Sequence, residues 1–239
     1  MCTVIRGISS MATRGLLAEL ASLYATRSGM AVSFESVGGV DAARRVHDGD
    51  DFDLVVLASE AIDRLASTGR VDAAGRVDIA TSCVGVAVRA GAPRPDIASE
   101  DALRRAVARA DRIAFSTGPS GVALKALFAR WGIADEIAPR LVQAPPGTPI
   151  GALLARGDAE LGFQQTSELL GVDGIVLLGP LPTAVQITTV FTAAPVRGSA
   201  CRIAMHDTVN DMLRFMASTA GDAARQRHGL QAPPGSPTR

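Results

Sequence analysis

Small hydroxyl-bearing residues and glycines cluster at three places where a strand-like segment gives way to a helix-like one. The three clusters are Ser9 and Ser10; Ser36, Gly38 and Gly39; and Ser116, Thr117, Gly118, Ser120 and Gly121. Hydroxyls donate hydrogen bonds, glycines let backbone approach a ligand closely, and a helix N-terminus adds unpaired N–H groups and the positive end of a dipole. Together these residues predict the capture of an anion. Each cluster alone also fits an ordinary helix cap or turn.

The elements that would position these clusters alternate between strand and helix patterns in the first part of the chain. Residues 3–8, 31–36 and 53–59 read as strands, and residues 11–29, 40–50 and 60–69 read as the helices that follow them. This βα alternation is typical of a parallel sheet, whose strands all end at one edge. Because ligands of open α/β sheets bind at that edge, the clusters are expected to face a common ligand.

A strand at 84–91 and a helix that Ser99 caps are expected next. A second α/β set then begins, with the third cluster at its first strand-to-helix corner; its expected strands are 112–116, 138–144, 159–165 and 174–179, and its expected helices are 120–131 and 149–156. The last section is expected to form a strand at 185–195 and a helix at 207–229. The Pro- and Gly-rich residues 231–239 show no apolar periodicity and are expected to fray.

Composition excludes several classes of function. The formal net charge is +0 and aromatic residues make up 4% of the chain, so no nucleic-acid partner is expected. Cys2, Cys83 and Cys201 lack metal-ligand spacing, and no P-loop pattern surrounds Lys125, so neither a metal nor a cofactor is expected. No apolar run reaches the roughly 20 residues of a membrane helix, so no membrane insertion is expected. The N-terminus lacks an apolar leader segment, so we expect a cytoplasmic protein as the sequence stands, or a periplasmic one if a leader is missing.

Segments of the chain resemble a known superfamily. "GISSMATRGLLAEL", "AVSFESVGGVDAARR", "FSTGPSGVALKALFARWGI" and "DAELGFQQTSEL" are similar to solute-binding proteins related to periplasmic molybdate-binding proteins, over about residues 3–230. The resemblance implies an α/β, type II periplasmic-binding-protein fold, with mixed, mainly parallel sheets. It implies two lobes, residues 1–81 plus 186–239 and residues 82–185, joined by crossovers near Thr81 to Val84 and near Val185. It also places the ligand in a cleft between the lobes.

The resemblance carries over some ligand positions and not others. Ser10, with Ser9 beside it, and Ser36 match serines that hold the oxyanion in the molybdate binders. The backbone around Ser116, Thr117, Ser120 and Gly121 would supply amides from the second lobe. The tyrosine of that family has no match, because Gln164 or Gln165 stands there in "LGFQQTSEL". A glutamine amide both donates and accepts, which favours a ligand with carboxyl or hydroxyl groups over a bare tetrahedral oxyanion.

"GFQQ" and "VQITTVF" more closely resemble a branch that includes aconitate isomerase. That branch implies allylic proton transfer in a small polycarboxylate, with the N–H and hydroxyl donors stabilising the intermediate charge. The catalytic base stays unknown, although four ionisable side chains lie near first-lobe corners: Glu35, Asp41, His47 and Glu60.

The sequence therefore leaves three functions open. The favoured one is a solute-binding protein for a small carboxylate or oxyanion, with the membrane component of an ABC transporter as a partner if the chain is exported. The alternatives are an isomerase on the same scaffold and a cytosolic effector-sensing module.

Overall fold

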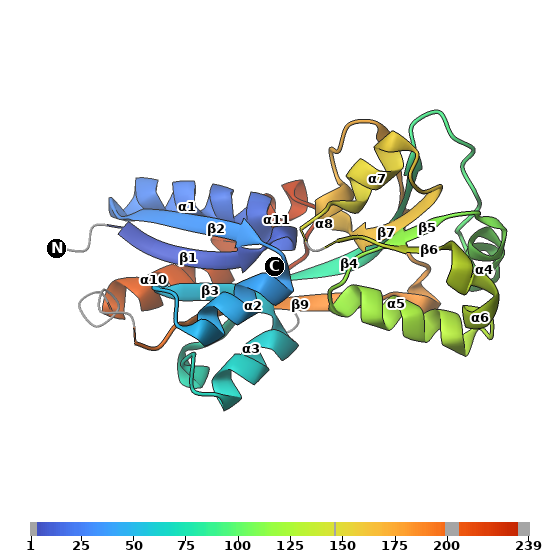
Figure 1. The fold of residues 1–239 in the computed structure, drawn as a ribbon. Coiled ribbons are helices and arrows are strands. Elements are labelled where there is room, and N and C mark those ends of the chain that lie inside the picture. The colour runs from blue at the N-terminus through green and yellow to red at the C-terminus, as the bar shows by residue number, and fades with distance from the viewer. Residues whose placement is uncertain (1–3, 146, 199–205, 234–239) are drawn as a thin grey trace. The chain divides into compact units, whose positions relative to one another are not determined.

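The computed structural model describes residues 4–145, 147–198 and 206–233, and divides the chain into two compact units (Figure 1). Unit 1 comprises Met1–Thr81 and Thr189–Arg239, and unit 2 comprises Ser82–Thr188. The chain passes between the units along two strands, β4 (Val77–Arg89) and β9 (Thr188–Pro195). Unit 2 is therefore one continuous stretch, whereas unit 1 is assembled from two.

The sheet of unit 1 contains the first three strands of the chain together with β9 and the start of β4. Its order is β2-β1-β3-β9-β4, with β1 (Val4–Ser10), β2 (Ala31–Val37) and β3 (Leu54–Ala58). Strand β1 runs parallel to β2 and β3, and β9 runs antiparallel to β3. The parallel trio places the ends of β1 and β2 at one edge, as the βα alternation predicts.

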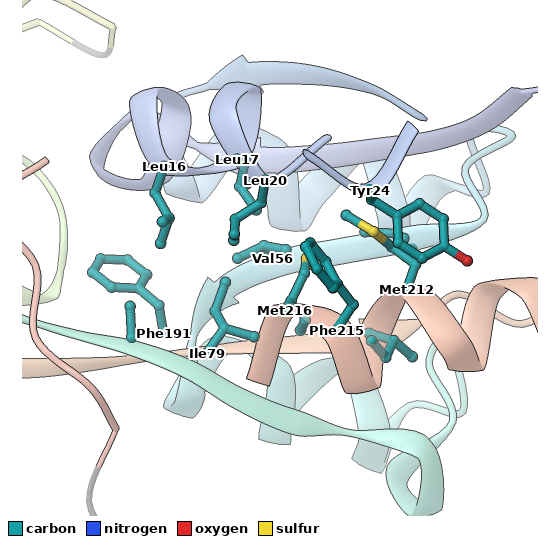
Figure 2. Close-up of a cluster of buried hydrophobic side chains, with 14 of the residues drawn as sticks. Leu16, Leu17, Leu20, Tyr24, Val56, Ile79, Phe191, Met212, Phe215 and Met216 are labelled. Carbon is teal, nitrogen blue, oxygen red and sulfur yellow. The ribbon is translucent and has the colours of Figure 1, made fainter. Parts of the chain in front are cut away.

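Helices cover both faces of this sheet. On one face pack α1 (Arg14–Ser28), α10 (His206–Ala217) and α11 (Asp222–Arg227), and on the other α2 (Gly39–Asp48) and α3 (Ser59–Ser67). Figure 2 shows Leu16, Leu17, Leu20 and Tyr24 of α1 gathered with Met212, Phe215 and Met216 of α10 around Val56, Ile79 and Phe191. The burial of this apolar surface stabilises the packing of α1 and α10 on the sheet, whose strands carry the first two clusters.

Unit 2 has a mixed sheet in the order β8-β4-β7-β5-β6. Its other strands are β5 (Ile113–Phe115), β6 (Leu141–Gln143), β7 (Leu161–Gln165) and β8 (Ile175–Pro180). Strand β5 is parallel to β6 and β7, whereas β4 is antiparallel to β7 and β8. The helices are α4 (Glu100–Arg109), α5 (Pro119–Arg130), α6 (Ala134–Ile137), α7 (Ile150–Arg156) and α8 (Thr166–Leu169). The first three pack on one face, and α7 and α8 pack on the other.

Short 3-10 turns join several of these elements. They are η1 (Met11–Thr13), η2 (Ala73–Gly75), η3 (Ala138–Arg140), η4 (Thr183–Val185) and η5 (Thr219–Gly221). Ser99 caps α4 as predicted, because its hydroxyl accepts a hydrogen bond from the Ala102 N–H at 3.2 Å. Within the described ranges, no helix is long and apolar enough to cross a membrane.

The structure corrects two element boundaries. The predicted helix over 207–229 is interrupted after Ala217, because the buried Arg225 guanidinium donates to the backbone carbonyls of Met216, Ser218 and Ile79. Strand β4 begins at Val77 rather than at residue 84, since the polar residues of 78–82 hide a buried strand from pattern analysis. The tail from 234 onward and Cys201 lie outside the described residues.

Candidate functional site

The first two clusters meet at the ends of β1 and β2 in unit 1. The parallel register pairs Ser9 with Ser36, and their hydroxyl oxygens lie 2.9 Å apart. Ser10 is 9% exposed, and its buried hydroxyl has no hydrogen-bond partner within the described part of the chain. A buried hydroxyl without a partner costs free energy, so it marks a position where a ligand atom would be favoured. We call these three serines the unit 1 corner.

Gly38 and Gly39 begin helix α2 beside this corner. Gly38 is the N-cap residue, and a Cβ added to Gly39 would lie 3.6 Å from the Cβ of Ser10. The start of α2 therefore lies against the Ser10 side chain. Because the first N–H groups of a helix lack partners inside it, their dipole favours a negative charge at this end of α2.

A cation that the sequence analysis did not single out borders the unit 1 corner. An open groove of about 750 Å³ runs between α1 and β2, and Arg14, Glu35 and Ser36 are among its lining residues. Arg14 is the first residue of α1 and its side chain is exposed. Arg14 could not be recognised from the sequence, because it is one of many arginines spread along the chain. The packing of α1 along β2 brings it to the groove that Ser36 also lines.

The third cluster forms the loop between β5 and α5 in unit 2. The hydroxyls of Ser116 and Ser120 lie 3.3 Å apart, and Gly118 is the N-cap residue of α5, with Thr117 preceding it. A Cβ on Gly121 would lie 1.9 Å from the Ser116 carbonyl oxygen, so only glycine permits this close approach. Phe115 pairs with Phe163 in the parallel register, which brings this loop beside the end of β7.

The two glutamines at the end of β7 are both buried and have different surroundings. The Gln164 side-chain carbonyl accepts a hydrogen bond from the Ile150 N–H at 2.9 Å, and its amide donates to the Glu168 carboxylate at 2.8 Å. Gln164 therefore connects the start of α7 to α8. Gln165, the next residue, has its side chain on the opposite side of the strand. Of the two, Gln165 is the better candidate for contact with a ligand.

Glu168 is an ionisable residue that the sequence analysis did not identify. Burial raises the pKa of its carboxyl to about 7, against the opposing effect of the Gln164 hydrogen bond. The Thr166 hydroxyl, at the start of α8, donates to the Cys83 carbonyl of β4 at 2.9 Å. Ser167 and Ser82 are the chain neighbours of these two residues. Both seryl hydroxyls are buried without a partner among the residues described. A carboxyl with a pKa near neutrality can both accept and return a proton.

The ionisable residues considered earlier have other contacts or surroundings. Glu35 pairs with Arg45 and Asp41 pairs with Arg44, while His47 and Glu60 are exposed. Lys125 lies over the Phe115 ring, with its Nζ 5.9 Å from the ring centroid. Thus the structure groups Ser9, Ser10, Ser36, Gly38 and Gly39 in unit 1, and Ser116, Thr117, Ser120, Gly121, Gln164 and Gln165 around neighbouring strand ends in unit 2. The contact of any of them with a ligand stays a prediction.

Comparison with known proteins identifies the family of this chain. Residues 5–231 match the family of bacterial extracellular solute-binding proteins. An aconitate isomerase from a Pseudomonas species is 33% identical over 242 residues, which cover 98% of this chain and 90% of that protein.

Two solved structures show the same fold. The periplasmic molybdate-binding protein of Azotobacter vinelandii superposes with a TM-score of 0.77 at 19% identity, covering 96% of this chain and 99% of that one. The sulfate-binding protein of Mycobacterium tuberculosis gives a TM-score of 0.75 at 16% identity, with coverages of 98% and 88%. The predicted α/β, periplasmic-binding-protein fold class is confirmed. The chain is a member of the bacterial extracellular solute-binding protein family.

Proposed function

We propose that this protein captures a small anion with carboxylate or oxyanion groups, using the unit 1 corner as its first set of donors. The observation that carries the proposal is the arrangement of Ser9, Ser10 and Ser36 at the ends of parallel strands. Two of their hydroxyls are paired, and the third is buried with no partner among the described residues. Hydroxyl groups and backbone N–H groups at the ends of strands and at the start of a helix can bind an anion without a cationic side chain. Arg14 adds a favourable long-range charge.

The β5–α5 loop and Gln165 form another candidate set of donors, within unit 2. The hydroxyls of Ser116 and Ser120 and the start of α5 offer the same kind of contact as the unit 1 corner. The solved relatives named above bind molybdate and sulfate, which supports an anionic ligand. The amide of Gln165 favours a carboxylate with hydroxyl or carboxyl substituents over a bare tetrahedral oxyanion. We further propose that such a solute passes to the membrane component of an ABC transporter, with the protein acting outside the cytoplasm.

A ligand panel tests this proposal. Thermal unfolding of the whole chain is followed with molybdate, sulfate, phosphate, citrate, cis-aconitate and trans-aconitate, each at increasing concentration. A ligand at 100 times its Kd should add about 2.7 kcal/mol to the free energy of unfolding. Hits are then measured by isothermal titration calorimetry. Absence of saturable binding for every anion in the panel would contradict the proposal.

Isomerisation of a small polycarboxylate is a second candidate function. The aconitate isomerase relative, similar over nearly the whole chain, favours it. The reaction needs a base next to a carboxylate-bearing methylene and donors for the charge that spreads over the allylic carbons. Incubation with each aconitate isomer in deuterated buffer distinguishes the two candidates. Turnover or deuterium uptake indicates an enzyme, and saturable binding without either indicates a binding protein.

A further inference from the structure

We infer that the Glu168 carboxyl is the proton-carrying group of this scaffold, oriented by Gln164, and that its substrate is a polycarboxylate with an allylic methylene. The inference rests on the second candidate function above. It deepens that proposal by supplying the base that the sequence left unknown.

The geometry fixes one oxygen of this carboxyl. Gln164 is buried, its carbonyl oxygen is bound by the Ile150 N–H, and its amide donates to Glu168 Oε1 at 2.8 Å. Because both ends of the Gln164 amide are engaged, its orientation is set, and it holds Glu168 Oε1 in one place. Among the described residues, this is the one hydrogen bond that the carboxyl makes. Its second oxygen, Oε2, is therefore left to accept a proton from the substrate. A base held by a neighbouring group loses little conformational freedom when the substrate binds.

The surroundings of Glu168 fit proton transfer rather than an ion pair. The elements packed on α8 are β7, β8 and α7. Strands β7 and β8 carry no ionisable side chain, and Arg156 at the end of α7 pairs with Asp158. On β4, Cys83 contacts Thr188 through its thiol, and Arg89 lies toward Gly157. Among the described residues, burial is thus the main cause that raises the pKa of Glu168, and the Gln164 hydrogen bond opposes it.

Two further buried hydroxyls lie in the segments that the Thr166–Cys83 hydrogen bond joins. Ser82 is 1% exposed and its hydroxyl has no partner in the described ranges, and the Ser167 hydroxyl is likewise buried without one. Ser167 directly precedes Glu168, and Ser82 directly precedes the Cys83 carbonyl that binds Thr166. Buried hydroxyls without a partner are candidate donors to a polar ligand.

The chemical step balances within the substrate and Glu168. The Glu168 carboxylate removes a proton from the methylene carbon, and the C–H electron pair spreads over the three allylic carbons and the attached carboxylates. The double bond moves by one position as the protonated Glu168 returns the proton to the far allylic carbon. No atom is gained or lost and no oxidant or reductant is required.

The test uses the whole chain, Glu168→Gln, and Glu136→Gln as a matched control on the exposed face of α6. Each protein is incubated with cis- or trans-aconitate in deuterated buffer, with a protein-free sample as background. Proton NMR follows loss of the methylene signal and formation of the other isomer. Calorimetry gives Kd for each variant, and circular dichroism confirms folding. Glu168→Asp serves as a second variant in case Glu168→Gln does not fold.

We expect Glu168→Gln to lower the exchange rate by roughly 100- to 10,000-fold, with Kd changed less than threefold and Glu136→Gln equal to wild type. The wild-type rate should rise with pH through an apparent pKa of about 7, and Glu168→Asp should move that midpoint. Exchange by Glu168→Gln at the wild-type rate overturns the role of Glu168 and leaves the isomerase candidate standing. Wild-type binding without exchange overturns both the role of Glu168 and the isomerase candidate. No binding of any carboxylate overturns the polycarboxylate substrate, and the anion-binding proposal then stands or falls on the molybdate, sulfate and phosphate arms of the panel above.

Discussion

The Ser36 hydroxyl pairs with the Ser9 hydroxyl of the neighbouring strand, and we propose that it also donates to the anion. Replacement of Ser36 with alanine removes one donor and leaves the Ser9 hydroxyl without its partner. We expect anion binding to weaken by about 1 to 3 kcal/mol, measured as Kd by calorimetry. Ser33→Ala, an exposed serine on the same strand, is the control and should keep wild-type affinity. Unchanged affinity in Ser36→Ala would remove Ser36 from the site.

The raised pKa of Glu168 predicts a pH dependence of stability. The pKa of a glutamate is 4.5 when unshifted, and about 7 here. Between these values the folded state retains a proton that the unfolded state has released. The contribution of Glu168 to the free energy of unfolding is therefore fully present below pH 4.5 and is lost as pH rises to 7. Because the side chain is partly exposed, we expect a loss of about 1 to 3 kcal/mol.

Glu168→Gln isolates this contribution, because glutamine keeps the hydrogen bond from Gln164 and cannot ionise. Its free energy of unfolding in urea should equal that of wild type at pH 5 and exceed it at pH 8. Equal values at both pH values would show that burial does not perturb this carboxyl.

At the scale of elements, the close approach of α5 to the Ser116 carbonyl is what shapes the unit 2 loop. Gly121→Ala inserts a methyl group 1.9 Å from that oxygen, so loop and helix must separate. We expect the free energy of unfolding to fall by about 1 to 3 kcal/mol, with weaker anion binding. Gly118→Ala is the matched control, since no atom lies within 4 Å of the added carbon. Urea denaturation of the two variants gives the comparison, and equal stabilities would contradict the steric argument.

Local patterns were sufficient to predict most elements and the positions of the three clusters of hydroxyl residues and glycines at strand ends. Helix α1, for example, follows from its leucine spacing and from Gly29, which ends it with a positive φ of 72°. Glu168 could not be found in this way, because a single glutamate in "TSEL" reads as a surface helix residue until β7, β8 and α7 pack on α8. The contact of Arg14 with the groove, and the interruption of the last helix by Arg225, likewise depend on segments distant in the chain.

At the scale of the whole molecule, the two units differ in how the chain builds them. Unit 2 is continuous over Ser82–Thr188 and has its own apolar core on both faces of its sheet. We expect a chain of residues 82–188 to fold alone, with a cooperative urea transition and a mixed α/β circular dichroism spectrum. Residues 1–81 alone lack β9 and α10, and should not give such a transition. A non-cooperative 82–188 fragment would show that unit 2 depends on unit 1.

The late position of β9 has a consequence for how the protein is made. Strand β9 lies between β3 and the start of β4 in the unit 1 sheet, yet more than a hundred residues of unit 2 are synthesised before it. On the ribosome, unit 2 can therefore complete its core first. Until β9 is synthesised, the β3 edge of the sheet formed by β1, β2 and β3 has no pairing strand. Chaperones that shield exposed strand edges would accordingly find their substrate in the nascent N-terminal segment.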